Sequence, residues 1–233
     1  MLSQRQLATT YHFNAIMVTK SPPELAPLRQ EIAAIAARMI AEDGADYRTA
    51  KRKAAQQILG NRRLNGDFMP NNSQIVEEVR LYNALFFADT QPARLAHLRQ
   101  LAIEIMTELA AFNPYLTGAV CNGTAGNHAD VHLQLFVDSA KDVEIYLLNK
   151  NVQFEISESE NSNRPTKQAR NSSEPLEILS FIYKREGVHL ALYETDALRG
   201  SIRPGGTAGD SGEYKDRVDL AAARLLITDQ NQP

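Results

Sequence analysis

The sequence has a single cysteine and no long apolar run. Cys121 alone excludes an internal disulfide framework and any zinc or iron–sulfur site built from several cysteines. No apolar run approaches the roughly 20 residues that a membrane-spanning helix needs. The first residues also lack the continuous apolar segment of a secretory signal. We therefore expect a cytoplasmic protein with no membrane partner.

An excess of basic charge is missing as well. The 233 residues carry 25 Lys and Arg against 28 Asp and Glu, for a net charge of −3. That balance argues against the overall basic character of many nucleic-acid-binding proteins. Hydrophobic residues make up 43% of the chain and charged residues 23%, which is ordinary for a globular protein and argues against disorder. The length suits one large domain, or a core domain with a smaller helical addition.

Apolar residues recur at helical spacing through the first half of the chain. The pattern predicts four helices, at residues 28–39, 47–59, 74–86 and 92–112. Asn72 or Ser73 is the expected cap of the third helix. The apolar stripes of the last two helices are expected to be core, although one of them could serve a homodimer. Pro114 cannot continue a helix, and it therefore ends this half.

The second half shows strand patterns. Strands are predicted at 115–121, 130–137, 152–157, 176–183 and 188–193, the last two joined by a Lys-Arg-Glu-Gly hairpin. Residues 139–151 fit a strand or a helix, and we prefer the helix because it provides a crossover. A final helix is expected at 214–226. The prediction is an α+β fold, with a helical region at 1–114 and a domain at 115–233 built on a mixed sheet of about five strands with flanking helices.

The densest group of polar residues follows the first predicted strand. That strand leads into Asn-Gly-Thr, where glycine permits close approach and backbone N–H groups could face an anion. Asp130, His132 and Gln134 then project from one side of the next strand. A carboxylate and an imidazole placed in this way could hold a divalent ion or activate a hydroxyl group.

These residues resemble the nucleotidyltransferase superfamily with the DNA polymerase β type of catalytic domain. The family pattern is an apolar strand ending in Gly-Ser or Gly-Thr, a short helix, a strand carrying Asp-x-Asp or Asp-x-Glu, and a third acid on a later neighbouring strand. Gly123 and Thr124 match the first element, and Asp130 matches the first acid. Glu155 is the best match to the third acid, and Glu144 is the alternative.

The resemblance covers roughly residues 115–157, and it implies a site and a reaction. Asp130 and Glu155 would bind Mg²⁺, or Mn²⁺ in its place, and an NTP would give its nucleotidyl group to an unknown acceptor. The residues expected at the nucleotide are Asn122, Gly123 and Thr124. Asp130 and His132 are the expected catalytic pair, with His132 as a substitute metal ligand or a proton acceptor.

Two departures from the family pattern leave a second function open. His132 stands where the second acid belongs, and Mg²⁺ prefers oxygen ligands to imidazole. The segment between Thr124 and Asp130 is also short for the family's helix. The alternative is therefore a non-catalytic nucleotide-binding or interaction protein that retains the fold.

Other interpretations of the same segment stay open. His128, Asp130 and His132 form a His-x-Asp-x-His pattern that would suit Zn²⁺ or Mn²⁺ if the strand began at His128. Asp130 could also simply cap a turn, and His132 could be a partly exposed strand residue. The basic residues from Arg48 to Arg63 are expected to form a solvated helix face. A contact with nucleic acid through them is the less favoured reading, and it requires that they face the Asn-Gly-Thr loop.

Overall fold

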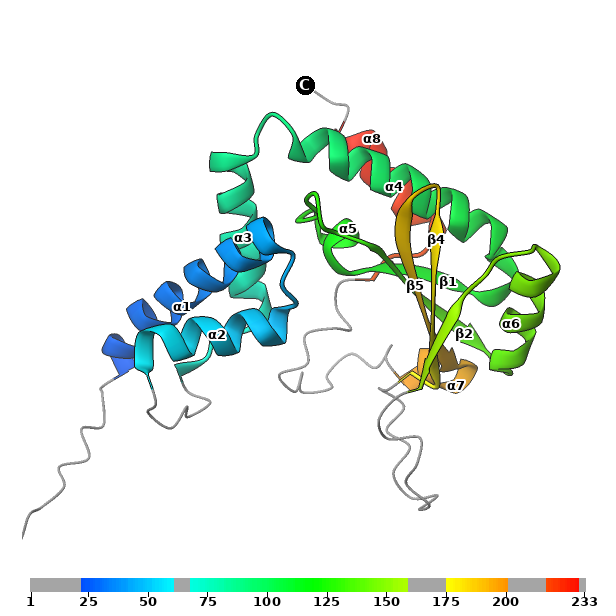
Figure 1. The fold of residues 1–233 in the computed structure, drawn as a ribbon, viewed down its shortest axis with the longest axis horizontal. Helices are drawn as coiled ribbons and strands as arrows, with labels where there is room; N and C mark the ends of the chain where they lie inside the picture. Colours follow the sequence, from blue (N-terminus) through cyan, green and yellow to red (C-terminus); the bar gives the residue numbers. More distant parts are fainter. Residues whose placement is uncertain (1–21, 61–67, 159–174, 201–216, 231–233) are drawn as a thin grey trace, which may run out of the picture.

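The computed structural model describes residues 22–60, 68–158, 175–200 and 217–230 (Figure 1). These residues form eight α-helices and one mixed sheet of five strands. Helices occupy the first half, and the sheet with its flanking helices follows, so the predicted α+β fold class is confirmed. In the described part of the chain, no helix combines the length and the apolar character needed to cross a membrane.

Four helices fill the first half: α1 (Pro22–Asp43), α2 (Tyr47–Leu59), α3 (Asn72–Phe86) and α4 (Gln91–Glu108). Polar caps begin α2 and α3, because each cap side chain accepts a hydrogen bond from a free N–H of the first turn. Asp46 accepts from Thr49 N at 2.9 Å. Asn71 accepts from Gln74 N at 2.8 Å, and Gln74 accepts in return from Asn71 N. The cap of α3 is therefore Asn71, one residue before Asn72 and two before Ser73, the two positions predicted.

A change of backbone direction separates α4 from the sheet. A short 3₁₀ helix (Ala110–Phe112) ends at Asn113, whose φ of 48° is left-handed. Pro114 then opens the first strand, as its fixed φ and missing N–H allow at a strand start.

The sheet consists of β1 (Pro114–Thr117), β2 (Val131–Val137), β3 (Glu155–Glu158), β4 (Glu177–Tyr183) and β5 (Glu186–Glu194). Its spatial order is β1-β2-β5-β4-β3, in which only β2 and β5 run parallel. The predicted hairpin joins β4 to β5. Lys184 and Arg185 make its two-residue turn with φ values of 50° and 73°, the conformation that suits the twist of the flanking strands.

Helix α6 (Ala140–Asn149), with Ser139 as its N-cap residue, confirms the helical interpretation of residues 139–151. The prediction of a strand from Tyr115 to Cys121 is wrong in its second half. β1 ends at Thr117, and Gly118, with a φ of 71°, turns the chain into α5 (Gly118–Asn122). A positive φ of this size breaks an extended backbone, and glycine adopts it without steric cost. Cys121 therefore lies in a helix, where it is buried.

Two further helices complete the chain: α7 (Thr195–Gly200) and α8 (Leu220–Gln230). The final helix was predicted to begin at Tyr214, which lies outside the described residues together with the glycine-rich segment 203–212. Figure 1 shows α8 beside α4 along one side of the sheet and α7 at the opposite end of the strands.

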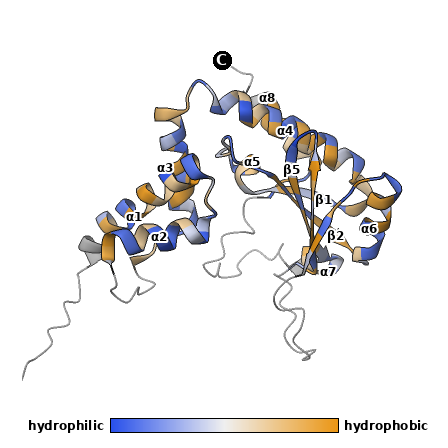
Figure 2. Ribbon diagram, viewed as in Figure 1, coloured by the Kyte–Doolittle hydropathy of each residue, from blue (hydrophilic) through white to orange (hydrophobic). Residues whose placement is uncertain are grey.

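Hydrophobic side chains form two main clusters. The larger one joins α4, α6 and α8 to one face of the sheet through residues such as Leu98, Leu133 and Leu190. The second holds α1, α2 and α3 together around Ile32 and Ile75. Hydrophobic and hydrophilic residues alternate around these helices, as Figure 2 shows. In the described chain, α1 to α3 belong to one cluster, whereas α4 packs with the sheet in the other. The strands themselves begin later, at Pro114.

Part of the apolar surface of α3 enters neither cluster. Ile75 and Val79 are buried, but Leu81, Leu85 and Phe86 expose more than half of their surface. These three residues are one place where a homodimer could form, and the homodimer stays a prediction.

Candidate functional site

A row of polar side chains crosses the sheet on the face opposite the larger hydrophobic cluster. Each member of the row pairs in register with the next, so all of them project from the same side. In order from β1 to β3, the row is Thr117, His132, His189, Ser180 and Glu155. Its centre is the parallel pair β2–β5, where the two histidines are direct neighbours.

Hydrogen bonds connect Ser180, His189 and Asp130 in series. Ser180 Oγ lies 2.9 Å from His189 Nδ1, and His189 Nε2 lies 3.2 Å from Asp130 Oδ2. Because a carboxylate only accepts, Nε2–H donates to Asp130, and Nδ1 of a neutral ring then accepts from the Ser180 hydroxyl. This series can take a proton from a hydroxyl group.

The second histidine stacks on the first. The rings of His132 and His189 lie 4.8 Å apart at an interplanar angle of 17°. His132 is the exposed residue of β2. Desolvation lowers the pKa of His132 from 6.5 to about 4, repulsion from His189 adds to the effect, and Asp130 opposes it. His132 is therefore neutral at neutral pH.

Asp130 occupies space that a glycine leaves free. It precedes β2 directly, and a Cβ added to Gly187 would lie 2.4 Å from Asp130 Oδ1. Behind it, Arg94 of α4 forms a two-pronged ion pair with Glu186, which also contacts His97. The hydrogen bonds to Glu186 raise the pKa of Arg94, and those to Arg94 lower the pKa of Glu186.

The structure does not bring the predicted metal ligands together. Glu155 lies on the edge strand β3, three strands from β2, which at about 4.8 Å per strand is about 14 Å. Glu144 lies in α6. The described residues include no group of three or more His, Cys, Asp or Glu side chains that could hold a metal ion. Asp130 with two imidazoles also supplies too few oxygens for Mg²⁺.

Side chains of α3 and α4 donate hydrogen bonds to the predicted nucleotide loop, residues 122–125. Its carbonyls accept side-chain hydrogen bonds in turn: Asn122 O from Arg80, Gly123 O and Ala125 O from Gln91, and Thr124 O from Asn83. The backbone N–H groups of residues 123, 124 and 125 all donate to Ala119 O. The Thr124 hydroxyl donates to Asn122 Oδ1 at 2.7 Å. The loop thus turns its amides inward, and its role toward a nucleotide stays a prediction.

His128 is not part of the strand face. It lies in a turn before β2, where a Cβ added to Gly44 would meet its Cβ at 2.6 Å. His128, Asp130 and His132 therefore do not project together from one strand, as the His-x-Asp-x-His pattern would require.

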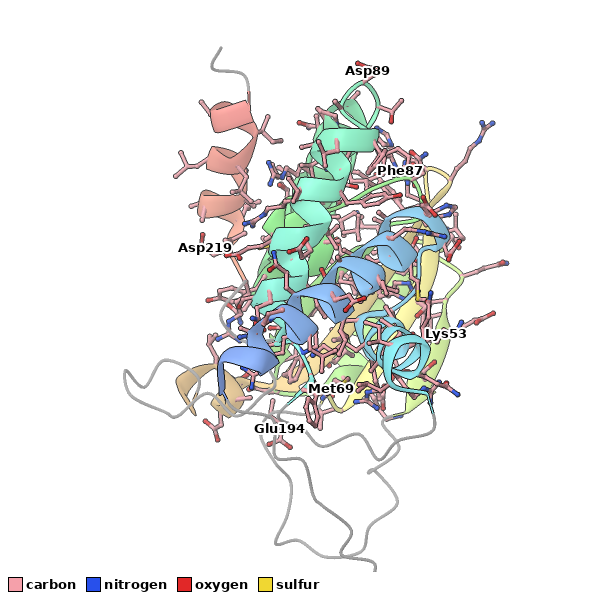
Figure 3. All side chains as sticks on the ribbon, turned by 90° about the vertical axis from the view of Figure 1, so that its left-hand side faces the viewer. Lys53, Met69, Phe87, Asp89, Glu194 and Asp219 are labelled. Carbon is pink, nitrogen blue, oxygen red and sulfur yellow. The ribbon has the colours of Figure 1, made fainter. Side chains whose placement is uncertain are left out.

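The basic residues of α2 point outward. Arg48, Arg52 and Lys53 are exposed, and Figure 3 shows Lys53 on the outer side of its helix. In the turn between α1 and α2, Gly44 lies against His128, which follows the Asn-Gly-Thr segment by four residues. Arg62 and Arg63 lie outside the described residues, and a nucleic-acid contact through α2 stays the less favoured prediction.

The sequence alone indicated no role for His189, Ser180 or Gly118. A repeat in the sequence could have indicated His189, because Val-His-Leu occurs at 131–133 and again at 188–190. The two copies pair residue for residue in β2 and β5. Gly118 is the glycine that ends β1 before a short helix, and a Cβ there would lie 3.7 Å from the His132 side chain.

The chain has no match among known proteins: no family model, curated protein or solved structure matches it.

Proposed function

We propose that the chain is a nucleotidyltransferase-like protein that binds a nucleotide without two-magnesium nucleotidyl transfer. The order of its elements supports this. β1 ends at Thr117, Gly118 turns the chain into the short helix α5, β2 comes next, and β5 later lies beside β2. This resembles the family order, and on it Asp130, His132 and His189 stand at the three positions where the family carries acids.

One observation carries the proposal: of the three positions Asp130, His132 and His189, Asp130 alone carries a carboxylate, and it is hydrogen-bonded to His189. Two Mg²⁺ ions need several oxygen ligands and several negative charges. Because His132 and His189 take two of the three positions, those positions supply neither oxygen ligands nor negative charge. Binding at this face would therefore rest on the protein's own hydrogen-bonding groups.

Those groups suit the uncharged part of a nucleotide. The Thr117 and Ser180 hydroxyls and the His132 ring lie in one row, and they can contact ribose hydroxyls or a base edge. The phosphates require a cation. Arg217 is on this face, where it lies over the rings of Tyr115 and Phe136 and donates to Gln134 Oε1 at 3.4 Å.

The test measures binding and turnover separately. Each of the four labelled NTPs is titrated with Mg²⁺, with Mn²⁺ and with EDTA, and pyrophosphate release is followed in parallel. We expect binding that survives EDTA, with no pyrophosphate release. Asp130→Asn should weaken binding because His189 loses its acceptor charge, and the distant Glu155→Gln should match the wild type.

Two results would contradict the proposal. Metal-dependent pyrophosphate release that Asp130→Asn abolishes and Glu155→Gln retains would show an active transferase. Absence of binding for all four NTPs would reject nucleotide recognition and leave a structural or interaction module.

A gain-of-function variant tests the reason for the missing metal. His132→Asp combined with His189→Asp places three carboxylates at the β2–β5 pair. We expect this double variant to bind Mn²⁺, measured by electron paramagnetic resonance, whereas wild type and His128→Asp do not. If the double variant gains no Mn²⁺ affinity, the absence of acids is not what prevents metal binding.

A further inference from the structure

A pocket of about 380 Å³ lies at the edge of the sheet, between α3, α4, α5 and α8. Three arginines line it, together with Cys121, Asn122 and Leu226. We call it the arginine pocket, defined by Arg80, Arg99 and Arg217. Its volume falls in the range of about 300–1,000 Å³ that small-molecule sites occupy. Among the described residues, none that lines it is acidic.

Arg99 is the innermost of the three. Only 7% of its surface is exposed, and its partners are two backbone carbonyls, Val120 O at 3.2 Å and Leu226 O at 3.0 Å. Burial lowers the pKa of Arg99, because the charged form is poorly solvated there. A buried charge that lacks an ionic partner is costly, and an anion in the pocket would offset that cost.

Free N–H groups point to where such an anion would bind. Arg99 Nη2 has no hydrogen-bond acceptor among the described residues, and a Cβ added to Gly123 would lie 3.6 Å from it. Gly123 therefore leaves the approach to this nitrogen open. Arg80 likewise has a neutral acceptor, because its Nε and Nη2 both donate to Asn122 O.

Three guanidinium groups around one cavity favour a particular class of ligand. Guanidinium stays charged under all ordinary conditions, and its planar fork matches phosphate oxygens two at a time. The backbone carbonyls to which Arg80 and Arg99 donate neutralise neither charge, so without an anion these two charges repel each other. A carboxylate would satisfy one fork, whereas a phosphate or diphosphate can engage several.

We propose that the arginine pocket binds the phosphate group of a small molecule. The site does not depend on Asp130 or on nucleotide binding at the sheet face. Its ligand is either a free phosphate-type ion or the phosphate portion of a nucleotide whose remainder reaches the sheet face past Arg217.

Inorganic pyrophosphate is the first probe, titrated by calorimetry into the full chain at constant ionic strength without metal. We expect saturable binding that weakens at higher salt. Arg80→Gln and Arg217→Gln should each weaken it at least about tenfold, the usual effect of losing a charge-assisted hydrogen bond. Arg52→Gln, an exposed arginine on α2, is the matched control and should bind as the wild type does. Circular dichroism checks that each variant is folded.

Arg99→Lys separates charge from geometry at the innermost position, because lysine keeps the charge and loses the fork. We expect weaker pyrophosphate binding in this variant with the fold retained. The proposal is overturned if wild type shows no binding at millimolar pyrophosphate, or if Arg52→Gln weakens binding as much as Arg80→Gln.

Competition identifies the source of the phosphate. If ATP displaces pyrophosphate, the pocket holds nucleotide phosphates; if ATP fails to displace it, the ligand is a separate phosphate ion. Asp130→Asn should leave pyrophosphate affinity unchanged. Failure of nucleotide binding at the sheet face is thereby distinguishable from failure of the arginine pocket.

Discussion

Two arginines of α4, Arg94 and Arg99, stand in opposite electrostatic situations. Arg94 has a carboxylate partner, Glu186, and its pKa is raised. Arg99 is more deeply buried, has only backbone carbonyls as partners, and its pKa is lowered. The region around Arg94 is therefore internally neutralised and supports the row on the sheet, whereas the region around Arg99 has unmet positive charge that a ligand can neutralise.

Replacing Arg94 and Arg99 in turn should give the largest measurable difference between the two regions. Arg94→Met leaves the largely buried Glu186 with His97 as its remaining partner, which should cost about 3 kcal/mol. Arg99→Met should cost only about 1 kcal/mol, because the lost hydrogen bonds are partly offset by removal of a poorly solvated charge. Chemical denaturation with urea measures both.

The control for this pair is Arg94→Met combined with Glu186→Gln, which removes the stranded charge and should recover part of the stability. If Arg99→Met destabilised as much as Arg94→Met, the carbonyls would be sufficient partners for Arg99. The pocket would then have no unmet charge for an anion to neutralise.

Gly187→Ala tests how firmly Asp130 is held in place beside the Arg94–Glu186 ion pair. The new Cβ would overlap the Asp130 carboxylate, and overpacking of this kind costs about 2 kcal/mol. For a chain of this size we expect Tm to fall by roughly 2–4 °C per kcal/mol, measured by calorimetry. Gly126→Ala is the matched control, since nothing lies within 4 Å of a Cβ there.

Adding Asp130→Ala to Gly187→Ala should restore part of the lost Tm, because the overlap disappears. A Gly187→Ala protein as stable as the wild type would mean that Asp130 can move aside. The series from Ser180 to Asp130 would then not be fixed.

The elements themselves could be predicted because their signals are local. Helical spacing and Pro114 located the helices, and alternation located β2. Gly118 was the local exception, because the apolar residues on both sides of it fit a strand as well as a short helix. The order of the strands depends on pairing between distant segments, which no local pattern contains.

The candidate site was predicted only in the part that lies within one strand. Asp130 and His132 followed from a motif and from alternation. Glu155 was predicted as the third acid because it lies in a β-rich run. In the structure that run is the edge strand β3, three strands away from β2. His189 reaches His132 only through the parallel register of β2 and β5. The arginine pocket likewise joins residues from α3, α4 and the segment before α8, so sequence spacing could not reveal it.

The smallest expected effect concerns the protonation of His132. Its pKa in the folded chain is about 4, below the unfolded value of 6.5, so between these values the unfolded chain binds more protons. Stability is therefore full above pH 6.5 and falls as pH drops from 6.5 toward 4. His132→Asn should remove this contribution, making the loss of Tm across that window smaller by about 2–4 °C, or about 1 kcal/mol once solvent screening of the exposed ring is included. A His97→Asn variant, with its exposed ring bonded to Glu186, controls for loss of a histidine elsewhere. An equal loss of Tm in wild type and His132→Asn would show that His132 binds a proton as readily in the folded chain as in the unfolded chain, and the neutral character assigned to His132 would be wrong.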